Sequence, residues 1–254
     1  MSYNPIRISS LAPVEREFIY GASRLSLFQP EGFKGRRYLM EERGLDVGTI
    51  SDFRVGYVPE SVSHVFSGRV VMPIFDHYGR LIALSVRGTT DDCEPKYWNE
   101  SYPKGENVFG LYNALRHVWE EGYIILVEGQ FDVMSMCGAG FKNTGGVLGG
   151  AFTPMQAQIL RRYVRQVVFL FDGDAAGREH SERAETVLEA YNTVSRAFAN
   201  KAIKHCCVSL PDGTDPDSFV MERGSIEMRK IIESALFSAG MKKRKSANGH
   251  SRRV

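Results

Sequence analysis

Residues 166–177 read QVVFLFDGDAAG, an apolar run that ends in two aspartates and is followed by small residues. A short continuous apolar run of this kind is typical of a strand covered on both faces of a parallel sheet. A similar run, YIILV at 123–127, comes earlier and ends at Glu128, and HCCVSL at 205–210 comes later. Helical patterns separate these runs, so the sequence predicts an α/β fold with a doubly wound parallel sheet.

Local signals support this alternation of strand and helix. Thr153 precedes Pro154 and stands three places before Gln156, which predicts a helix start with a capping box. After the run at 166–171, apolar residues fall on one face of a further helix at three- and four-residue spacing. Two short helices are expected after the run at 205–210.

The first part of the chain has a different pattern. Up to about Ser61 it is expected to be mostly helical, and residues 69–87, RVVMPIFDHYGRLIALSVR, predict a β-hairpin that turns at Asp76–Gly79. A smaller α+β subdomain is therefore expected before the parallel sheet. The predicted division is an N-terminal subdomain at 1–118, an α/β domain at 119–240 and a basic tail at 241–254 that we expect to be disordered.

Composition narrows the classes of protein. The chain has 254 residues with 43% hydrophobic and 24% charged residues, as in a globular domain. No apolar run is long enough to span a bilayer, and the first residues do not form a signal peptide, so a cytoplasmic location is expected. The four cysteines form no CxxC pair, which argues against zinc in this chain: Cys93, Cys137, Cys206 and Cys207.

The net charge of +2 is unevenly distributed. The tail from Met241 carries six Lys or Arg residues and no acid, and without it acids outnumber bases. Any nucleic-acid surface on the folded body must therefore be a local patch. The tail itself can either contact phosphates or remain a solvated charge run.

Acidic residues follow two of the predicted strands directly. Glu128 ends the run at 123–127, and Asp172 and Asp174 follow the run at 166–171. Because the carboxyl ends of parallel strands share one edge, these side chains are expected to converge there. Three carboxylates repel one another unless a cation neutralises them, and oxygen ligands without His or Cys favour Mg²⁺ or Mn²⁺.

A simpler reading exists for each acidic group. Asp172 and Asp174 can cap a helix that begins near Ala175. A further cluster in LPDGTDPD at 210–217, which includes Asp215 and Asp217, can be ordinary turn chemistry or the site of a second metal ion. The chain has neither the spacing of a P-loop nor that of a dinucleotide-binding loop.

Taken together, the motifs resemble the catalytic core of bacterial and phage replicative primases, which contains a Toprim domain. EGQFDV at 128–133 and DGDAAG at 172–177 resemble the two Toprim signatures. The wider resemblance runs from about Arg37 to Ala235 and includes, in order, YLMEERGL, FRVGYVP, the hairpin segment, PKYWNES, PKGENVFGLYNAL and LPDGTDPDSF.

The resemblance implies an activity and a set of site residues. The family makes short RNA primers on single-stranded DNA from ribonucleoside triphosphates, by metal-dependent nucleotidyl transfer. Glu128, Asp172 and Asp174 match its main catalytic metal ligands, and Asp215 and Asp217 match its additional acidic pair, so two Mg²⁺ or Mn²⁺ ions are expected. The expected nucleotide or template contacts are Arg69, Arg87, Lys96, Asn99 and Lys104.

The resemblance also implies partners. Family members usually carry a zinc-binding domain and a helicase-interaction domain, and neither is recognisable here. A separate zinc-bearing primase component and a replicative helicase are therefore expected partners, as for a minimal core from a phage, where the location would be the host cytoplasm. A Toprim nuclease and a non-catalytic replication module remain alternatives from the sequence.

Overall fold

The computed structural model describes residues 11–149, 151–198 and 201–241. It divides into two compact units, Met1–Pro103 and Lys104–Val254. Beyond Met241, the predicted basic tail lies outside the described residues. Among the helices that are described, none combines the length and the apolar character needed to cross a membrane.

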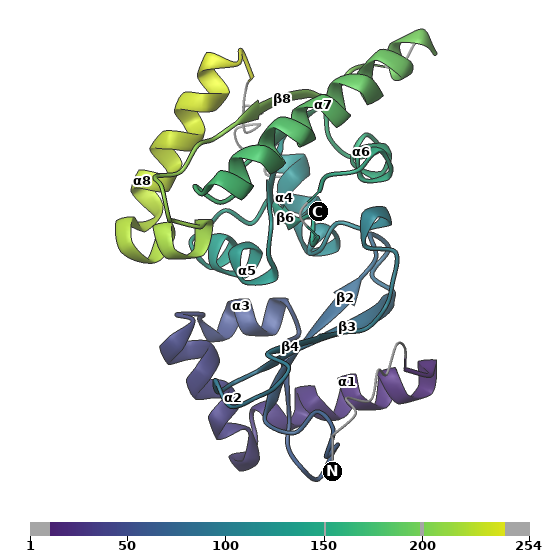
Figure 1. Cartoon of the computed structure of the whole chain (residues 1–254), viewed down its shortest axis with the longest axis vertical. Helices are drawn as coiled ribbons and strands as arrows, with labels where there is room; N and C mark the ends of the chain where they lie inside the picture. Colours follow the sequence, from purple (N-terminus) through teal and green to yellow (C-terminus); the bar gives the residue numbers. More distant parts are fainter. Residues whose placement is uncertain (1–10, 150, 199–200, 242–254) are drawn as a thin grey trace, which may run out of the picture. The chain divides into compact units, whose positions relative to one another are not determined.

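The first unit is an antiparallel sheet with helices packed around it (Figure 1). Its strands are in the order β1-β2-β3-β4, and every pair is antiparallel. The strands are β1 Gly56–Val58, β2 Arg69–Phe75, β3 Leu81–Gly88 and β4 Tyr97–Asn99. The helical segments are α1 Pro13–Leu27, η1 Pro30–Gly32, α2 Phe33–Arg37, η2 Tyr38–Glu42 and α3 Val47–Asp52.

The predicted hairpin is confirmed as β2 and β3. Its turn is closed by Asp76, whose Oδ1 accepts hydrogen bonds from the backbone N–H groups of Tyr78 at 2.9 Å and Arg80 at 3.0 Å. Gly79 has a φ of +84°, a left-handed conformation that glycine adopts at little cost. The short side chain of aspartate and the glycine therefore fix this turn.

A buried carboxylate ties the first unit together. Glu100 is 1% exposed and follows β4 directly. It accepts hydrogen bonds from the backbone N–H of Leu11 at 3.0 Å, from that of Leu84 at 3.1 Å and from Arg16 Nε at 2.9 Å. One side chain thus joins α1, the chain entry to α1 and β3. Its charge is offset by the guanidinium and by backbone donors, as burial requires.

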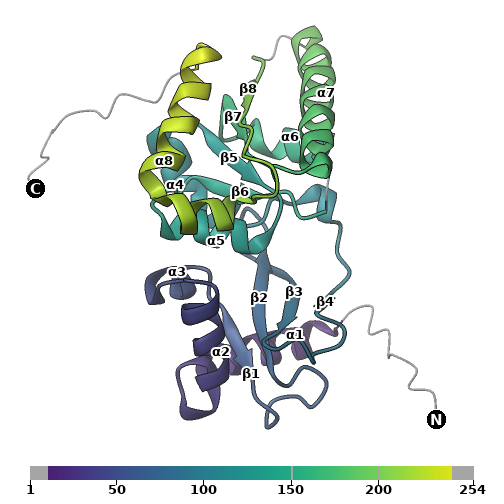
Figure 2. The ribbon, with the colours of Figure 1, turned by 60° about the vertical axis from the view of Figure 1, so that its left-hand side comes forward.

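The second unit contains the predicted parallel sheet, with strands in the order β6-β5-β7-β8. The strands are β5 Ile124–Val127, β6 Thr144–Gly146, β7 Gln166–Phe169 and β8 Lys204–Cys207. The helices are η3 Lys104–Glu106, α4 Leu111–Glu121, α5 Gln130–Gly138, α6 Pro154–Leu160, α7 Ala175–Ala197 and α8 Pro216–Ser238. The helices α5 and α8 pack together on the side of the sheet away from α7 (Figures 1 and 2).

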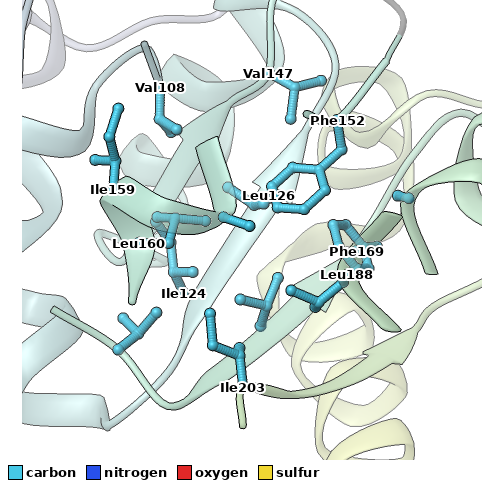
Figure 3. Close-up of a cluster of buried hydrophobic side chains, with 14 of the residues drawn as sticks. Val108, Ile124, Leu126, Val147, Phe152, Ile159, Leu160, Phe169, Leu188 and Ile203 are labelled. Atoms are coloured by element: carbon cyan, nitrogen blue, oxygen red, sulfur yellow. The ribbon is translucent and has the colours of Figure 1, made fainter. Parts of the chain in front are cut away.

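Alternating residues of the strands point to opposite faces of this sheet. Ile124 and Leu126 of β5, with Phe169 of β7, enter one buried cluster that includes Leu160 of α6 and Leu188 of α7 (Figure 3). Ile125 and Val127 are equally buried on the other face. Both faces are therefore covered, which explains the continuous apolar runs in the sequence.

Three short strands were not anticipated from the sequence: β1, β4 and β6, the last of which consists of Thr144, Gly145 and Gly146. The two short helices expected near the C-terminus are confirmed, because α8 consists of two helical segments that are separated by a kink at Gly224, where φ is 80° and ψ is 167°. The predicted start at Thr153 is confirmed, because its Oγ1 accepts a hydrogen bond from the backbone N–H of Gln156 at 3.1 Å.

The role of Glu100 generates a stability prediction. Glu100→Gln leaves Arg16 without its carboxylate partner inside the protein, so we expect the free energy of unfolding to fall by about 3–5 kcal/mol. Urea unfolding followed by circular dichroism measures the change. The matched control is Glu60→Gln, because Glu60 pairs with His64 at 3.4 Å in an exposed position and should leave the midpoint unchanged. Equal midpoints for both variants would contradict the structural role of Glu100.

Candidate active site

Two of the predicted acidic residues of the second unit lie where the chain reverses the direction in which it crosses the sheet. The chain runs from the central strand β5 outward to β6, and then returns to β7 on the other side of β5. Glu128 follows β5 directly, and Asp172 lies just beyond β7. In open α/β sheets the crevice at such a reversal is where ligands bind. The fold therefore places these two carboxylates at the expected binding edge.

Glu128 joins three segments at this edge. Its Oε1 accepts a hydrogen bond from the backbone N–H of Asp172 at 3.3 Å. Its Oε2 lies 2.9 Å from Nδ1 of His180 on α7. The convergence of Glu128 with the Asp172 loop, which the sequence predicts, is confirmed. The contact with His180 was not anticipated.

Asp172 is strongly perturbed by its surroundings. Its Oδ1 is buried and has no hydrogen-bond partner among the described residues. Burial, together with the nearby charges of Glu128, Asp132, Asp215 and Asp174, raises the pKa of Asp172 to about 7. A buried carboxylate oxygen without a donor, surrounded by other carboxylates, fits a position that binds a cation.

Asp174 and Asp215 both cap helices. Asp174 precedes α7, and its Oδ1 accepts a hydrogen bond from Gly177 N–H at 2.8 Å. Asp215 precedes α8, and its Oδ1 accepts one from Ser218 N–H at 2.6 Å. The capping interpretation of the Asp172 and Asp174 pair is therefore correct for Asp174, which is the residue that caps α7. The cap formed by Asp215 was not predicted, because its segment was interpreted as a turn or a second metal site. Because capping uses one oxygen of each carboxylate, it is compatible with a further role as a metal ligand.

Asp217 and Asp132 lie deeper in the same region. Asp217 is 6% exposed and accepts a hydrogen bond from Ser135 Oγ on α5. Asp132 was missed in the sequence argument, although it stands in the motif EGQFDV. Its Oδ2 accepts a hydrogen bond from Gly129 N–H at 2.8 Å, and burial, together with Asp215 and Asp217, raises the pKa of Asp132 to about 7. An aspartate three places after Gly129 at a helix start is the signal that could have identified it.

The donor set of this edge is made of oxygen atoms. Within the described ranges, no group of three or more acidic, His or Cys side chains is already arranged to hold a metal ion. The carboxylates are nevertheless close enough to raise the pKa of Asp172. Oxygen ligands of this kind suit Mg²⁺ or Mn²⁺. The residues present therefore fit a hard divalent cation.

A second set of predicted residues lies in the first unit. The guanidinium of Arg87 stacks 5.4 Å from the ring centre of Tyr38 and 4.9 Å from that of Tyr97, whose hydroxyl it also contacts at 2.8 Å. Arg87 and the exposed Lys96 line a hollow of about 200 Å³. Arg43 lines it too, and its Nε donates a hydrogen bond to Tyr38 Oη at 2.9 Å. Glu42 and Asp91 also line the hollow, so its three basic side chains leave an excess of positive charge that can attract phosphate groups. We call it the basic hollow.

The other predicted contact residues have different surroundings. Arg69 is 7% exposed and donates hydrogen bonds to the carbonyls of Pro95 at 2.6 Å and Glu94 at 3.2 Å. It therefore supports the loop that carries Lys96. Asn99 Oδ1 accepts a hydrogen bond from Ser85 Oγ at 2.6 Å. Lys104 is exposed and belongs to the second unit.

The raised pKa of Asp172 generates a prediction for the metal-free protein. An ionised carboxylate whose pKa is higher in the folded than in the unfolded state destabilises the fold, and this cost grows as pH rises from about 4 to about 7. Asp172→Asn removes the cost. With allowance for its partial exposure, we expect a stabilisation of about 1–2 kcal/mol at pH 8 and a smaller gain at pH 5.

Thermal unfolding in EDTA at the two pH values measures this difference. Asp92→Asn is the control, because Asp92 is an exposed aspartate of the first unit. A gain from Asp172→Asn that is the same at pH 5 and pH 8 would show that Asp172 is not perturbed by its neighbours.

Two family models match this chain. Residues 125–220 match a model described as Toprim-like, and residues 61–115 match the N-terminal domain of the DNA primase catalytic core. The chain is 34% identical to the DNA primase of Aquifex aeolicus, over 77% of this chain and 44% of that protein. It is 30% identical to the DNA primase of Escherichia coli K12, over 83% of this chain and 41% of that protein.

Solved structures give the same result. The Aquifex aeolicus primase structure with zinc-binding and RNA polymerase domains has a TM-score of 0.73 and 31% identity, and the match covers 87% of this chain and 60% of that one. The E. coli primase catalytic core has a TM-score of 0.75 and 27% identity, with coverages of 90% and 83%. A DnaG primase catalytic domain bound to single-stranded DNA has a TM-score of 0.71 and 27% identity, with coverages of 91% and 84%.

These matches cover the core of the relatives. The chain spans less than half the length of the curated primases it matches. The parallel sheet, the preceding α+β unit and both family matches agree with the fold of that core. The chain belongs to the bacterial DNA primase catalytic-core family, whose members contain a Toprim domain.

Proposed function

We propose that this chain is the catalytic core of a DNA primase, which makes short RNA primers on single-stranded DNA during replication. The observation that carries the proposal is the unpartnered, buried Oδ1 of Asp172 beside Glu128 at the reversal point of a Toprim-like sheet. In this proposal, residues 1–118 contact nucleotide and template, and residues 119–240 supply the metal-dependent chemistry.

The Toprim primase family is generally metal-dependent, and the proposed ions here are two Mg²⁺ or Mn²⁺. Glu128, Asp172 and Asp174 would hold them, with Asp215 and Asp217 as additional ligands. Bound ions of this kind lower the charge barrier between a triphosphate and an attacking hydroxyl group. The carboxylates keep the site strongly negative without a cation, so triphosphate binding is expected to depend on the metal.

The basic hollow of the first unit supplies the complementary charge. Arg87 and Lys96 would neutralise triphosphate or template phosphates, and Arg43 is added to this set because it lines the same hollow. The guanidinium of Arg87 contacts the rings of Tyr38 and Tyr97, and these contacts limit its motion before a ligand binds. Lys104 and Asn99 are proposed as further contacts. Binding through phosphates should be weak and sensitive to salt.

The proposal includes partners. The Aquifex primase structure that this chain resembles contains a zinc-binding domain alongside its RNA polymerase domain. We propose that a zinc-bearing primase component and a replicative helicase act with this chain in the cytoplasm. Template choice would then depend on the zinc-bearing component.

Primer synthesis tests the catalytic assignment. Purified protein is incubated with single-stranded DNA, labelled ribonucleotides and Mg²⁺ or Mn²⁺, and the products are separated on a gel. Asp172→Ala removes a metal ligand that contributes several kcal/mol to the transition state, so we expect a loss on the order of a thousandfold or more. Glu179→Ala, an exposed carboxylate on α7, is the matched control and should retain activity.

The products distinguish the alternatives. Short, template-dependent RNA that is absent with Asp172→Ala supports a primase core. Cutting of the template without RNA synthesis would indicate a Toprim nuclease. No product with either metal would contradict a self-sufficient core and favour an accessory module.

The basic hollow gives a separate kinetic prediction. Lys96→Ala removes an exposed charge from the hollow, and a lost charge-assisted contact of about 1.5 kcal/mol raises KM for ribonucleotides about tenfold. The change in kcat should be smaller, because Lys96 lies outside the carboxylate cluster. Lys34→Ala, which removes an exposed lysine of α2, is the control. An unchanged KM for Lys96→Ala would remove Lys96 from the proposed nucleotide site.

A further inference from the structure

His180 contacts the proposed metal site but is not one of its proposed ligands. It lies on α7, the helix that Asp174 caps. Its Nδ1 is 2.9 Å from Glu128 Oε2, and the side chains of the pair are only 21% and 18% exposed. The contact connects a residue beyond β5 with a helix beyond β7, so it spans the reversal point of the sheet.

The direction of this hydrogen bond follows from the chemistry of the two groups. An ionised carboxylate offers only lone pairs, so the proton must be on the imidazole Nδ1. Both the neutral tautomer with a proton on Nδ1 and the imidazolium meet this condition. The contact therefore acts through geometry, whichever of these two forms is present.

The hydrogen bond limits the motion of Glu128. The other carboxylate oxygen accepts from Asp172 N–H at 3.3 Å, which is longer than the contact with His180. A glutamate side chain has several rotatable bonds and loses much freedom when it is ordered. With contacts on both oxygens, the carboxylate of Glu128 is oriented before a cation binds.

We propose that His180 is a positioning residue that holds the Glu128 carboxylate in the orientation that binds Mg²⁺ or Mn²⁺. The inference rests on the metal site of the proposed function. Partners that orient metal ligands through hydrogen bonds typically change metal affinity or activity by 10- to 100-fold when they are removed. Because His180 contacts Glu128, a proposed metal ligand, its effect should be on metal affinity.

Metal binding is measured without template or nucleotides. Mn²⁺ is titrated into the protein and free Mn²⁺ is followed by electron paramagnetic resonance. His180→Ala should weaken Mn²⁺ binding about tenfold. His180→Asn, whose amide nitrogen can occupy nearly the place of Nδ1, should restore most of the affinity.

His117→Ala is the matched control. His117 also lies on a helix, and its Nδ1 is 3.2 Å from Oε2 of Glu120, but this pair is on α4 and not at the proposed metal site. The control should bind Mn²⁺ as the wild type does. Circular dichroism and thermal unfolding in EDTA establish that each variant is folded.

The Mg²⁺ dependence of primer synthesis distinguishes a positioning role of His180 from a general loss of catalytic activity. In primer synthesis, His180→Ala should raise the Mg²⁺ concentration needed for half-maximal rate about tenfold, while kcat at saturating Mg²⁺ largely recovers. A loss of kcat that no Mg²⁺ concentration restores would overturn a purely positioning role.

The remaining outcomes are also decisive. Wild-type Mn²⁺ affinity in folded His180→Ala would overturn the inference, and if that variant does not fold, equal affinities of His180→Asn and His180→Leu would do so. If the wild type binds no Mn²⁺, the metal site and the role of His180 both fail. If Mn²⁺ binding depends on His180 but no primers form, only the proposed activity fails.

Discussion

The repulsion between carboxylates at one sheet edge is the constraint on which the second unit depends. Glu128 and Asp172 are brought together by two adjacent parallel strands, and their charges oppose this arrangement. The backbone segments around Asp172 are closely packed, because a Cβ added to Gly177 would lie 2.0 Å from the carbonyl oxygen of Asp172. The loop after β7 therefore has little room to relax. The repulsion is the kind that a bound cation would offset in the proposed function.

The buried charged side chains of the first unit have two kinds of surroundings. Glu100 and Arg69 are buried with their hydrogen-bonding groups directed to the backbone or to a partner, so their charges serve the fold. Arg87 is also buried, but it lines a hollow together with Lys96, and its neighbours are aromatic faces. Burial alone therefore does not distinguish the structural residue Arg69 from Arg87, which is a proposed phosphate contact; the difference is that Arg87 lines the hollow.

Much of the fold could be predicted from the sequence, because its strongest strands are continuous apolar runs. The hairpin, the strands β5, β7 and β8 and the cap at Thr153 all follow from local patterns. The strand β6 could not be predicted, since two of its three residues are glycines that have no strand preference. Its glycines are explained by tertiary packing: a Cβ on Gly145 would lie 2.8 Å from the side chain of Val108.

Part of the candidate site, like much of the fold, could also be predicted from the sequence. The convergence of Glu128 with the Asp172 loop follows from the parallel direction of the strands, which the alternating pattern of strand and helix predicts. His180 was missed because its contact with Glu128 arises only when α7 packs beside the strand ends. Asp132 was missed although its place at a helix start, three residues after Gly129, is a local signal. Arg69 was expected to contact ligands, and only the structure shows that it donates to the carbonyls of Glu94 and Pro95.

The interruption of α8 at Gly224 affects which substitutions the second unit can tolerate. It divides α8 into a first segment, which begins at the Asp215 cap, and a second segment that packs through Met228, Ile232 and Leu236. The positive φ of Gly224 changes the direction of the helix axis there. The two segments therefore pack as separate helices, each through its own contacts. The first segment is also held by the hydrogen bond that Asp217 accepts from Ser135 on α5. We therefore expect substitutions in the second segment to leave the carboxylate at the start of α8 in place.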